Sequence, residues 1–416
     1  MTTTAGRQRR HSAVAGWVVS TRHALDRPLT SYYLLLGAST LLLTIGLMMV
    51  LSASSVYAYD HHDGNSYFYV VRQLTWVLLG LPVAFVASRL PHRMLRWLAW
   101  PAILAACVLL ALTQTGMGVQ VNGNQNWLAL GPLVIQPAEI AKLAVILWCA
   151  DVYARKERLL GDWRHAVLPV VPVTGLIIGL VVVGRDLGTA LVLMAIVLGM
   201  LWVVGAPMRL FVGSLLAVGA LALYLATTSQ ERLERLTNFA DPFKDYQGAG
   251  WQPAHGLFAL SSGGWFGKGI SASQQKWGSL PEAHTDFIFA VLGEELGLVG
   301  TVLVLVLFLT IGYAGIRVAV RTKDPFVRYM SAGITIWLMA QMMINIGMVL
   351  ALLPVIGLPL PLVSYGGSAL LPSLVALGLL ISFARKEPGA ASALKAKRRR
   401  RSAGVTAGGG LSRRGQ

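Results

Sequence analysis

Long apolar stretches separated by short polar segments run through almost the whole chain. Each stretch is about 20 residues long, which is the length of α-helix that crosses the hydrocarbon core of a bilayer. A window of about 19 residues predicts membrane-spanning helices near residues 31–55, 70–88, 95–113, 135–154, 166–183, 186–204, 209–228, 286–316, 327–352 and 362–384. The predicted fold class is therefore an all-α polytopic membrane protein with ten transmembrane helices and one large extracellular loop between helices 7 and 8.

The distribution of basic residues gives an independent test of this topology. An even number of spans places both termini on the same side, and cytoplasmic segments carry the excess of Lys and Arg. With a cytoplasmic N-terminus, 27 of the 35 Lys and Arg residues fall on the cytoplasmic side. The order of segments is then a basic cytoplasmic N-tail (1–30), seven transmembrane helices (31–228), the extracellular loop (229–285), three transmembrane helices (286–387) and a disordered basic cytoplasmic C-tail (388–416).

Composition agrees with a membrane protein and excludes a soluble globular one. Hydrophobic residues make up 55% of the chain and mean hydropathy is +0.62. Only 13% of residues are charged, against roughly 25% in soluble domains. The net charge of +17 does not indicate nucleic acid, because no aromatic residues interleave the basic tail; membrane lipid headgroups are its expected contact. Cys107 and Cys149 lie singly in apolar runs and predict neither a disulfide framework nor a metal site.

Several charged residues interrupt the apolar runs, where each costs about 2.5 to 3.5 kcal/mol on insertion scales. Glu139 and Lys142 share a helix face at i, i+3 and either pair with one another or line an aqueous cavity. Asp186 opens the sixth span and either caps that helix or belongs to a polar path. Glu294 and Glu295 lie deep in the eighth span and require inward partners.

Asp286 lies where the polar run LPEAHTD meets the eighth apolar span. One interpretation is structural, since Thr285 or Asp286 would make an ordinary N-cap for that helix. The other is catalytic, because a partly desolvated carboxylate at a membrane edge has a raised pKa and can act as a general base. His284 and Glu282 lie close to Asp286 in the sequence.

The longer motifs resemble the SEDS family of shape, elongation, division and sporulation proteins, typified by FtsW and RodA. The resemblance covers about residues 30 to 387. It is closer to the division branch, because Ser31-Tyr32-Tyr33 and the eighth-span motif are more similar to that branch. The motifs are MVLSAS (49–54), NGNQNWLALGPLVIQPAEIAK (122–142), DLGTA (186–190), GGWFGKG (263–269), LPEAHTDFIFAVLGEELGLVG (280–300) and NIGMVLALLPVIGLPLPLVSYGGS (345–368).

This resemblance implies a peptidoglycan glycosyltransferase that polymerises lipid II on the outer face of the cytoplasmic membrane during septal wall synthesis. It also implies a class B penicillin-binding protein as transpeptidase partner, together with other membrane proteins of the division complex. The catalytic aspartate of the family falls on Asp286, and its conserved Glu and Lys of the fourth span fall on Glu139 and Lys142.

The implied reaction displaces a lipid diphosphate, whose developing charge needs cationic stabilisation. Lys142, Lys268 and Lys276 are candidates for this, as is a divalent cation such as Mg²⁺ or Mn²⁺ held by the diphosphate itself; no protein metal site or other cofactor is expected. His284 and Ser364 complete the expected substrate-binding residues. The Gly-rich run from Ser364 is also compatible with a simple helix start that has no role in binding. Three alternatives remain open, namely a lipid II flippase, a non-catalytic scaffold and an elongation-branch polymerase with the same chemistry.

Overall fold

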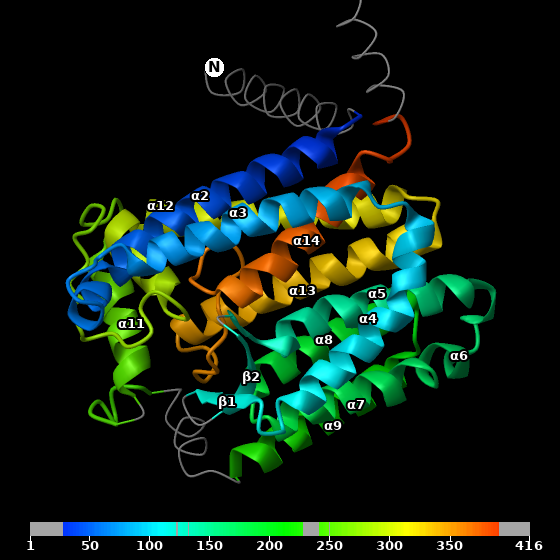
Figure 1. The fold of residues 1–416 in the computed structure, drawn as a ribbon, viewed down its shortest axis with the longest axis horizontal. Coiled ribbons are helices and arrows are strands. Elements are labelled where there is room, and N and C mark those ends of the chain that lie inside the picture. The colour runs from blue at the N-terminus through cyan, green and yellow to red at the C-terminus, as the bar shows by residue number, and fades with distance from the viewer. Residues whose placement is uncertain (1–27, 122–123, 132, 228–240, 249, 391–416) are drawn as a thin grey trace, which may run out of the picture.

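We describe the protein from a computed structural model, in which residues 28–121, 124–131, 133–227, 241–248 and 250–390 are described (Figure 1). Eight helices in these ranges are long and apolar enough to cross a membrane, and each coincides with a predicted span. The expectation of a mostly helical multi-pass fold is confirmed. These helices are α2 (Thr30–His61), α3 (Phe68–Arg89), α4 (His92–Leu112), α6 with α7 (Trp163–Val167 and Val170–Val183), α8 (Leu187–Val204), α12 (Ile288–Arg321), α13 (Pro325–Val349) and α14 (Gly367–Ala384).

Helices α5 (Pro137–Arg155) and α9 (Met208–Thr227) occupy the two other predicted spans. A short 3-10 turn, η1 (Glu157–Leu159), follows α5. The predicted outer loop contains the helix α11 (Trp251–Ser262). Helix α14 begins later than predicted, because Leu362 has φ of +66° and Gly366 is extended, so the chain becomes helical only at Gly367. Most of the two predicted tails lies outside the described residues.

The all-α prediction is wrong for residues 118–135, which form a small antiparallel sheet. Strands β1 (Gly118–Val121), β2 (Asn124–Leu130) and β3 (Leu133–Ile135) pair in the order β1-β2-β3. The Asn, Gly and Trp content of these residues favours a re-entrant or interfacial turn, and that expectation is wrong. The alternating β-branched and aromatic residues favour strands instead, and Gly131 makes the second turn with φ of +63°.

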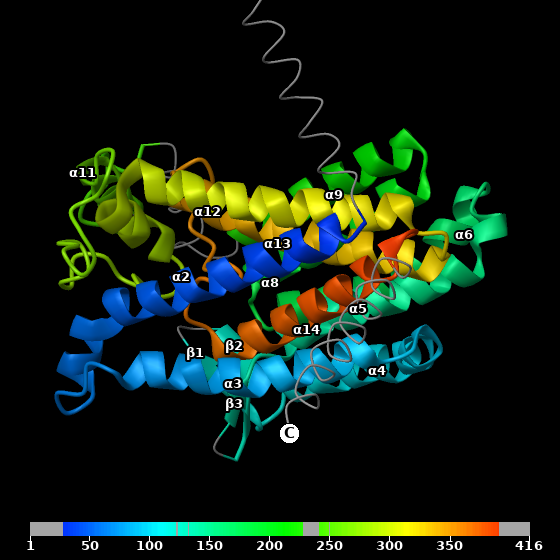
Figure 2. The same ribbon diagram turned by 90° about the horizontal axis from the view of Figure 1, so that it is seen from above.

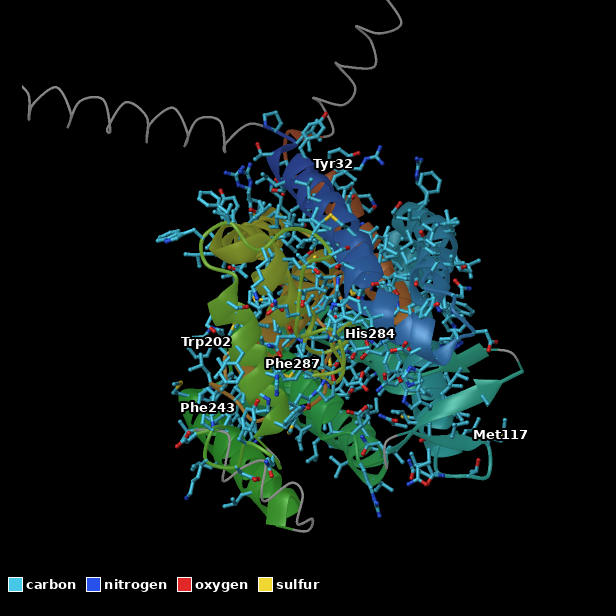
Figure 3. The ribbon with its side chains drawn as sticks, turned by 90° about the vertical axis from the view of Figure 1, so that its left-hand side faces the viewer. Tyr32, Met117, Trp202, Phe243, His284 and Phe287 are labelled. Carbon is cyan, nitrogen blue, oxygen red and sulfur yellow. The ribbon has the colours of Figure 1, made fainter. Side chains whose placement is uncertain are left out.

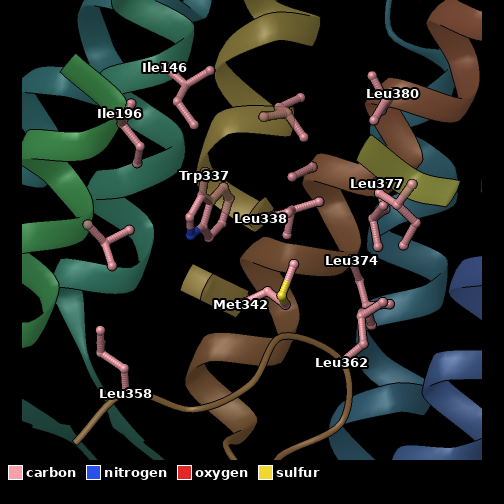
Figure 4. Packing of buried hydrophobic residues seen from close by; sticks show 14 of the residues in the cluster. Ile146, Ile196, Trp337, Leu338, Met342, Leu358, Leu362, Leu374, Leu377 and Leu380 are labelled. Atoms are coloured by element: carbon pink, nitrogen blue, oxygen red, sulfur yellow. The ribbon is translucent and has the colours of Figure 1, made fainter. Parts of the chain in front are cut away.

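Helix α13 lies at the centre of the bundle, which is elongated along its helices (Figures 1 and 2). It packs against α5, α8 and α12, while α14 packs mainly against α3. In α13 and α14, 67% of the most apolar window is buried, against 28% in α3 and α4, so the latter two are peripheral. Figure 4 shows the central contacts, which involve Ile146, Ile196, Trp337, Leu338, Met342, Leu374 and Leu377.

One end of the bundle carries α11 and the segment that leads into α12, and we call it the loop end (left in Figure 1). Large apolar side chains remain exposed along the outer helices, for example Leu78 and Phe85 on α3 and Val306 and Leu309 on α12. Such continuous apolar surface is unusual on a soluble protein. It is the surface that lipid covers in a membrane protein.

Helix α12 is broken at Gly297, and the GGWFGKG segment (263–269) fills the break. Gly297 has φ of +66° and ψ of −164°, a conformation open essentially to glycine alone. In an unbroken helix, the N–H groups of residues 298 and 299 would bond to the carbonyls of residues 294 and 295. Here those carbonyls accept from Lys268 N and Gly269 N at 2.9 and 3.1 Å, while the two N–H groups donate to Gly264 O and Trp265 O at 2.9 and 3.1 Å.

Substituting Gly297→Ala should destabilise the protein by roughly 3 kcal/mol, because a Cβ would strain the backbone and collide with backbone atoms of the 263–269 segment. Thermal unfolding of the purified protein in detergent measures this. The matched control is Gly175→Ala in α7, where a Cβ meets no atom within 4 Å and helix propensity favours alanine. Equal melting temperatures for both variants would contradict the broken-helix arrangement.

Candidate functional site

Asp286 lies at the loop end, immediately before α12, and does not cap that helix. The N-cap position is Phe287, and no side chain makes a capping bond there; the Thr285 hydroxyl donates to the Glu282 carboxylate instead. The capping interpretation of this motif is therefore wrong. Asn345 on α13 fixes the backbone by donating from Nδ2 to Asp286 O at 2.8 Å and to Leu358 O at 2.7 Å.

The Asp286 carboxyl is half-buried and faces the loop between α13 and α14 (350–366). A Cβ on Gly357 would lie 3.3 Å from Asp286 Oδ2, so the absence of a side chain there lets the loop approach the carboxyl. Burial raises the pKa of Asp286 to about 7, and the nearby negative charges of Glu282 and Asp186 contribute to the rise. A carboxylate with a pKa near neutrality is suited to general-base catalysis.

His284 is buried beside Asp286 within a cluster of tyrosines. Its ring stacks on Tyr57 at a centroid distance of 5.5 Å and lies 4.8 Å from Tyr69 and 5.7 Å from Tyr365. The backbone N–H of Tyr365 also donates to His284 O at 3.0 Å. Burial lowers the pKa of His284, against an opposing effect of Glu282. Figure 3 looks onto the loop end and shows His284 and Phe287 near its middle.

Glu139 and Lys142 form a buried ion pair deep in the bundle. Lys142 Nζ lies 2.8 Å from Glu139 Oε1, and both side chains are almost wholly inaccessible. Lys142 also donates to Gln341 Oε1 at 2.9 Å and lies over the Trp337 ring. Of the two interpretations left open by the sequence, the described geometry is that of an ion pair.

A chain of hydrogen bonds connects this ion pair to the Asp286 segment. Gln341 Nε2 donates to Pro359 O at 2.9 Å, and Asn345, one turn further along α13, joins Leu358 to Asp286. The sequence contains a pattern that indicates these two amides, because Gln341 and Asn345 are polar residues four apart within a predicted span and therefore share one helix face. We did not single them out as site residues.

Lys268 and Lys276 are held by the two glutamates of α12. Lys268 Nζ lies 2.8 Å from Glu294 Oε1, and Lys276 Nζ lies 3.1 Å from Glu295 Oε1. Ser52 of α2 also donates to both oxygens of Glu295, at 2.6 and 2.8 Å. The expectation that these glutamates need inward partners is confirmed.

Asp186 and Ser364 both stabilise local backbone structure. Asp186 caps α8 by accepting from Thr189 N at 2.9 Å, which confirms the capping interpretation. It also accepts from Asn126 of β2 and from Gln136, at 2.9 and 2.8 Å. The hydroxyl oxygen of Ser364 accepts from Leu360 N at 2.8 Å and closes a turn of the 350–366 loop.

The structure thus brings His284 and the 350–366 loop together around Asp286, while each of the three predicted lysines is bound to a carboxylate. The tyrosines around His284 come from α2, α3 and the 350–366 loop. No spacing in the sequence indicated their proximity, since it arises only when these three elements pack at the loop end.

The chain is similar to several known sequences and solved structures. The family model of cell cycle proteins that covers FtsW, RodA and SpoVE matches residues 32–388. The probable peptidoglycan glycosyltransferase FtsW of Mycobacterium tuberculosis is 40% identical over 375 residues, covering 90% of this chain and 71% of that protein.

Two solved structures share the fold, each with 30% identity over 85% of this chain and 97% of the matched chain. One belongs to a peptidoglycan synthase complex that coordinates polymerization and crosslinking, with a TM-score of 0.67. The other is the rod shape determining protein RodA of Thermus thermophilus, with a TM-score of 0.62.

Substituting Lys142→Met should destabilise the protein by about 3 to 5 kcal/mol, because it leaves the Glu139 carboxylate buried and uncompensated. The double variant Glu139→Leu with Lys142→Met removes both charges and should recover most of that loss. Detergent-phase thermal unfolding of wild type, both single variants and the double variant provides the measurement. Additive effects of the two substitutions would show that the residues are not energetically coupled.

Proposed function

The chain belongs to the family of cell-cycle proteins that includes FtsW, RodA and SpoVE, and we propose that it is a peptidoglycan glycosyltransferase of the division branch. It polymerises lipid II into glycan strands during septal wall synthesis. The observation that carries this proposal is the state of Asp286, a half-buried carboxyl with a pKa of about 7 that no helix-capping bond occupies.

We further propose a ten-span topology in which α5 and α9 also cross the cytoplasmic membrane. Both termini are then cytoplasmic, and the loop end, with Asp286, faces outward. The concentration of 27 of the 35 Lys and Arg residues on the opposite side supports this orientation. The chemistry then takes place where the sugar headgroup of an outward-facing lipid-linked substrate lies.

In the proposed reaction, Asp286 takes the proton from the 4-hydroxyl of the acceptor sugar. The hydroxyl oxygen forms a bond to the anomeric carbon of the donor sugar, and the bond from that carbon to the lipid diphosphate breaks. The diphosphate leaves as an anion of low basicity, so it needs no general acid, whereas glycosidases use two carboxyl groups. A positioned general base of this kind contributes about a hundredfold to ten-thousandfold.

Other residues support this step in different ways. We propose that His284 and Ser364 border the sugar-binding space beside Asp286. Lys142, Lys268 and Lys276 are held by carboxylates, so their proposed role is to fix the elements around the site. A divalent cation that arrives with the diphosphate is part of the substrate in this scheme.

The proposed partner is a class B penicillin-binding protein, which crosslinks the strands that this chain polymerises. Support comes from the similar chain in a peptidoglycan synthase complex. Other division proteins are expected to hold the pair at the septum.

Replacing Asp286→Asn should lower glycan polymerisation from lipid II by about a hundredfold to ten-thousandfold without lowering the melting temperature, because burial already disfavours the charged form. The assay resolves glycan products on gels, using the protein co-purified with its class B partner. Asp60→Asn, an exposed aspartate of α2 at the same end, is the control and should polymerise normally. Transport of lipid II across vesicles without any polymer from wild type would favour a flippase.

The pH dependence of polymerisation should reflect the ionisation of Asp286. A general base acts when deprotonated, so kcat/KM should rise about tenfold per pH unit below the pKa and level off above about pH 7. Glu282→Gln removes a neighbouring negative charge that raises this pKa, so its profile should move to lower pH. A profile that stays unchanged in Glu282→Gln would assign the titration to another group.

A further inference from the structure

A transferase that releases a lipid diphosphate needs cationic groups where the negative charge develops. Three lysines that the sequence suggested for this role are held by carboxylates at 2.8 to 3.1 Å. The surroundings of Asp286 are otherwise acidic, since Glu282 and Asp186 both act on its carboxyl. A diphosphate would be repelled there unless another cation compensates.

Arg72 on α3 is such a cation, and it is exposed at the loop end. Among the described residues it takes part in no ion pair. Its guanidinium lies 5.9 Å from the centre of the Phe68 ring and interacts with the Tyr365 hydroxyl. A guanidinium presents several N–H donors in one plane and can donate two parallel hydrogen bonds to two oxygens of a phosphate.

The neighbouring residue holds Arg72 beside the catalytic segment. Gln73 is buried and clamps α3 onto the 350–366 loop, donating from Nε2 to Ser364 O at 3.2 Å and accepting at Oε1 from Gly366 N at 3.3 Å. Tyr365, between these two loop residues, bonds to the backbone of His284. Arg72 is therefore connected through a single tyrosine to the segment that ends in Asp286.

The outer surface of α3 next to Arg72 suits the lipid part of the same ligand. Val71, Leu74 and Leu78 are exposed to 58, 43 and 62%, and they follow the helix away from the loop end. A polyprenyl chain lying along this apolar surface in the bilayer would bring its headgroup to the level of Arg72. Lipid recognition and diphosphate recognition would then involve adjacent faces of one helix.

We propose that Arg72, assisted by the Tyr365 hydroxyl, binds the diphosphate of the polyprenyl-linked substrate. The site deepens the proposed transferase function and rests on it. Arg72 stabilises the leaving group on one side of the reacting carbon, while Asp286 acts on the acceptor hydroxyl on the other.

The test is direct binding of undecaprenyl diphosphate to the full-length protein with its partner, in detergent and EDTA, so that only protein groups neutralise the ligand. Arg72→Gln should weaken binding roughly tenfold to a hundredfold, as expected for loss of hydrogen bonds to a charged group. Arg72→Lys should be intermediate, and Tyr365→Phe should lose a few-fold.

Arg89→Gln is the matched control, because Arg89 also lies on α3 over a phenylalanine four residues earlier, Phe85 at 4.7 Å, but near the opposite end of the helix. It should bind like wild type. Undecaprenyl monophosphate and phosphatidylglycerol complete the comparison, and both should bind more weakly and respond less to Arg72→Gln.

If Arg72→Gln bound undecaprenyl diphosphate as tightly as the wild type, with an unchanged melting temperature, the proposed diphosphate site would be wrong. Glycan polymerisation by the wild type would still support the proposed transferase function. An equal loss of phosphatidylglycerol binding would overturn the diphosphate site as well, since Arg72 would then be a general anchor for anionic headgroups. Failure of the proposed function would instead appear as diphosphate binding without any polymer.

Discussion

The hydrogen bonds between the break in α12 and the 263–269 segment are the constraint on which the site depends. They join an extramembrane segment to the interior of a helix and satisfy four backbone groups that the positive φ of Gly297 leaves unpaired. Two ion pairs strengthen the same junction, because Glu294 holds Lys268 of the segment itself and Glu295 holds the buried Lys276 that follows it. The first part of α12 is thereby fixed against the loop end, and Asp286, which immediately precedes it, is fixed with it.

A second constraint acts on Asp286 from inside the bundle. Charges in a low-dielectric interior persist only when they are paired and hydrogen-bonded, and the Glu139–Lys142 pair meets this condition with Gln341 as a further partner. The same glutamine contacts the 350–366 loop, and Asn345 continues the contact to the backbone of Asp286. The deep pair therefore orders the side of the site that the 263–269 segment does not reach. Rigid placement from two directions is what a positioned base requires.

The sequence predicted those features that depend on local hydrophobicity or on single costly charges. The spans, the need of Glu294 and Glu295 for partners and the interpretation of Asp186 as a cap all follow from residues within one helix. The sheet of residues 118–135 was missed because its Asn, Gly and Pro residues are typical of turns, and because its Asn126 contacts Asp186 far along the chain. The break at Gly297 was missed because a glycine within a predicted helix does not by itself indicate positive φ. The tyrosines around His284 and the clamp made by Gln73 depend on packing among distant elements, which no periodicity encodes.

The placement of charge also explains why one carboxylate can serve as base at this site. Cations within the bundle are neutralised, so they do not lower the pKa of Asp286, whereas burial and two neighbouring carboxylates raise it. A cation close to Asp286 would favour its ionised form and weaken it as a base. Arg72 acts on Tyr365 and reaches the catalytic segment through that tyrosine, without forming an ion pair with Asp286. Separating the base from the cation in this way lets a single site withdraw a proton from one sugar and stabilise a departing diphosphate from the other.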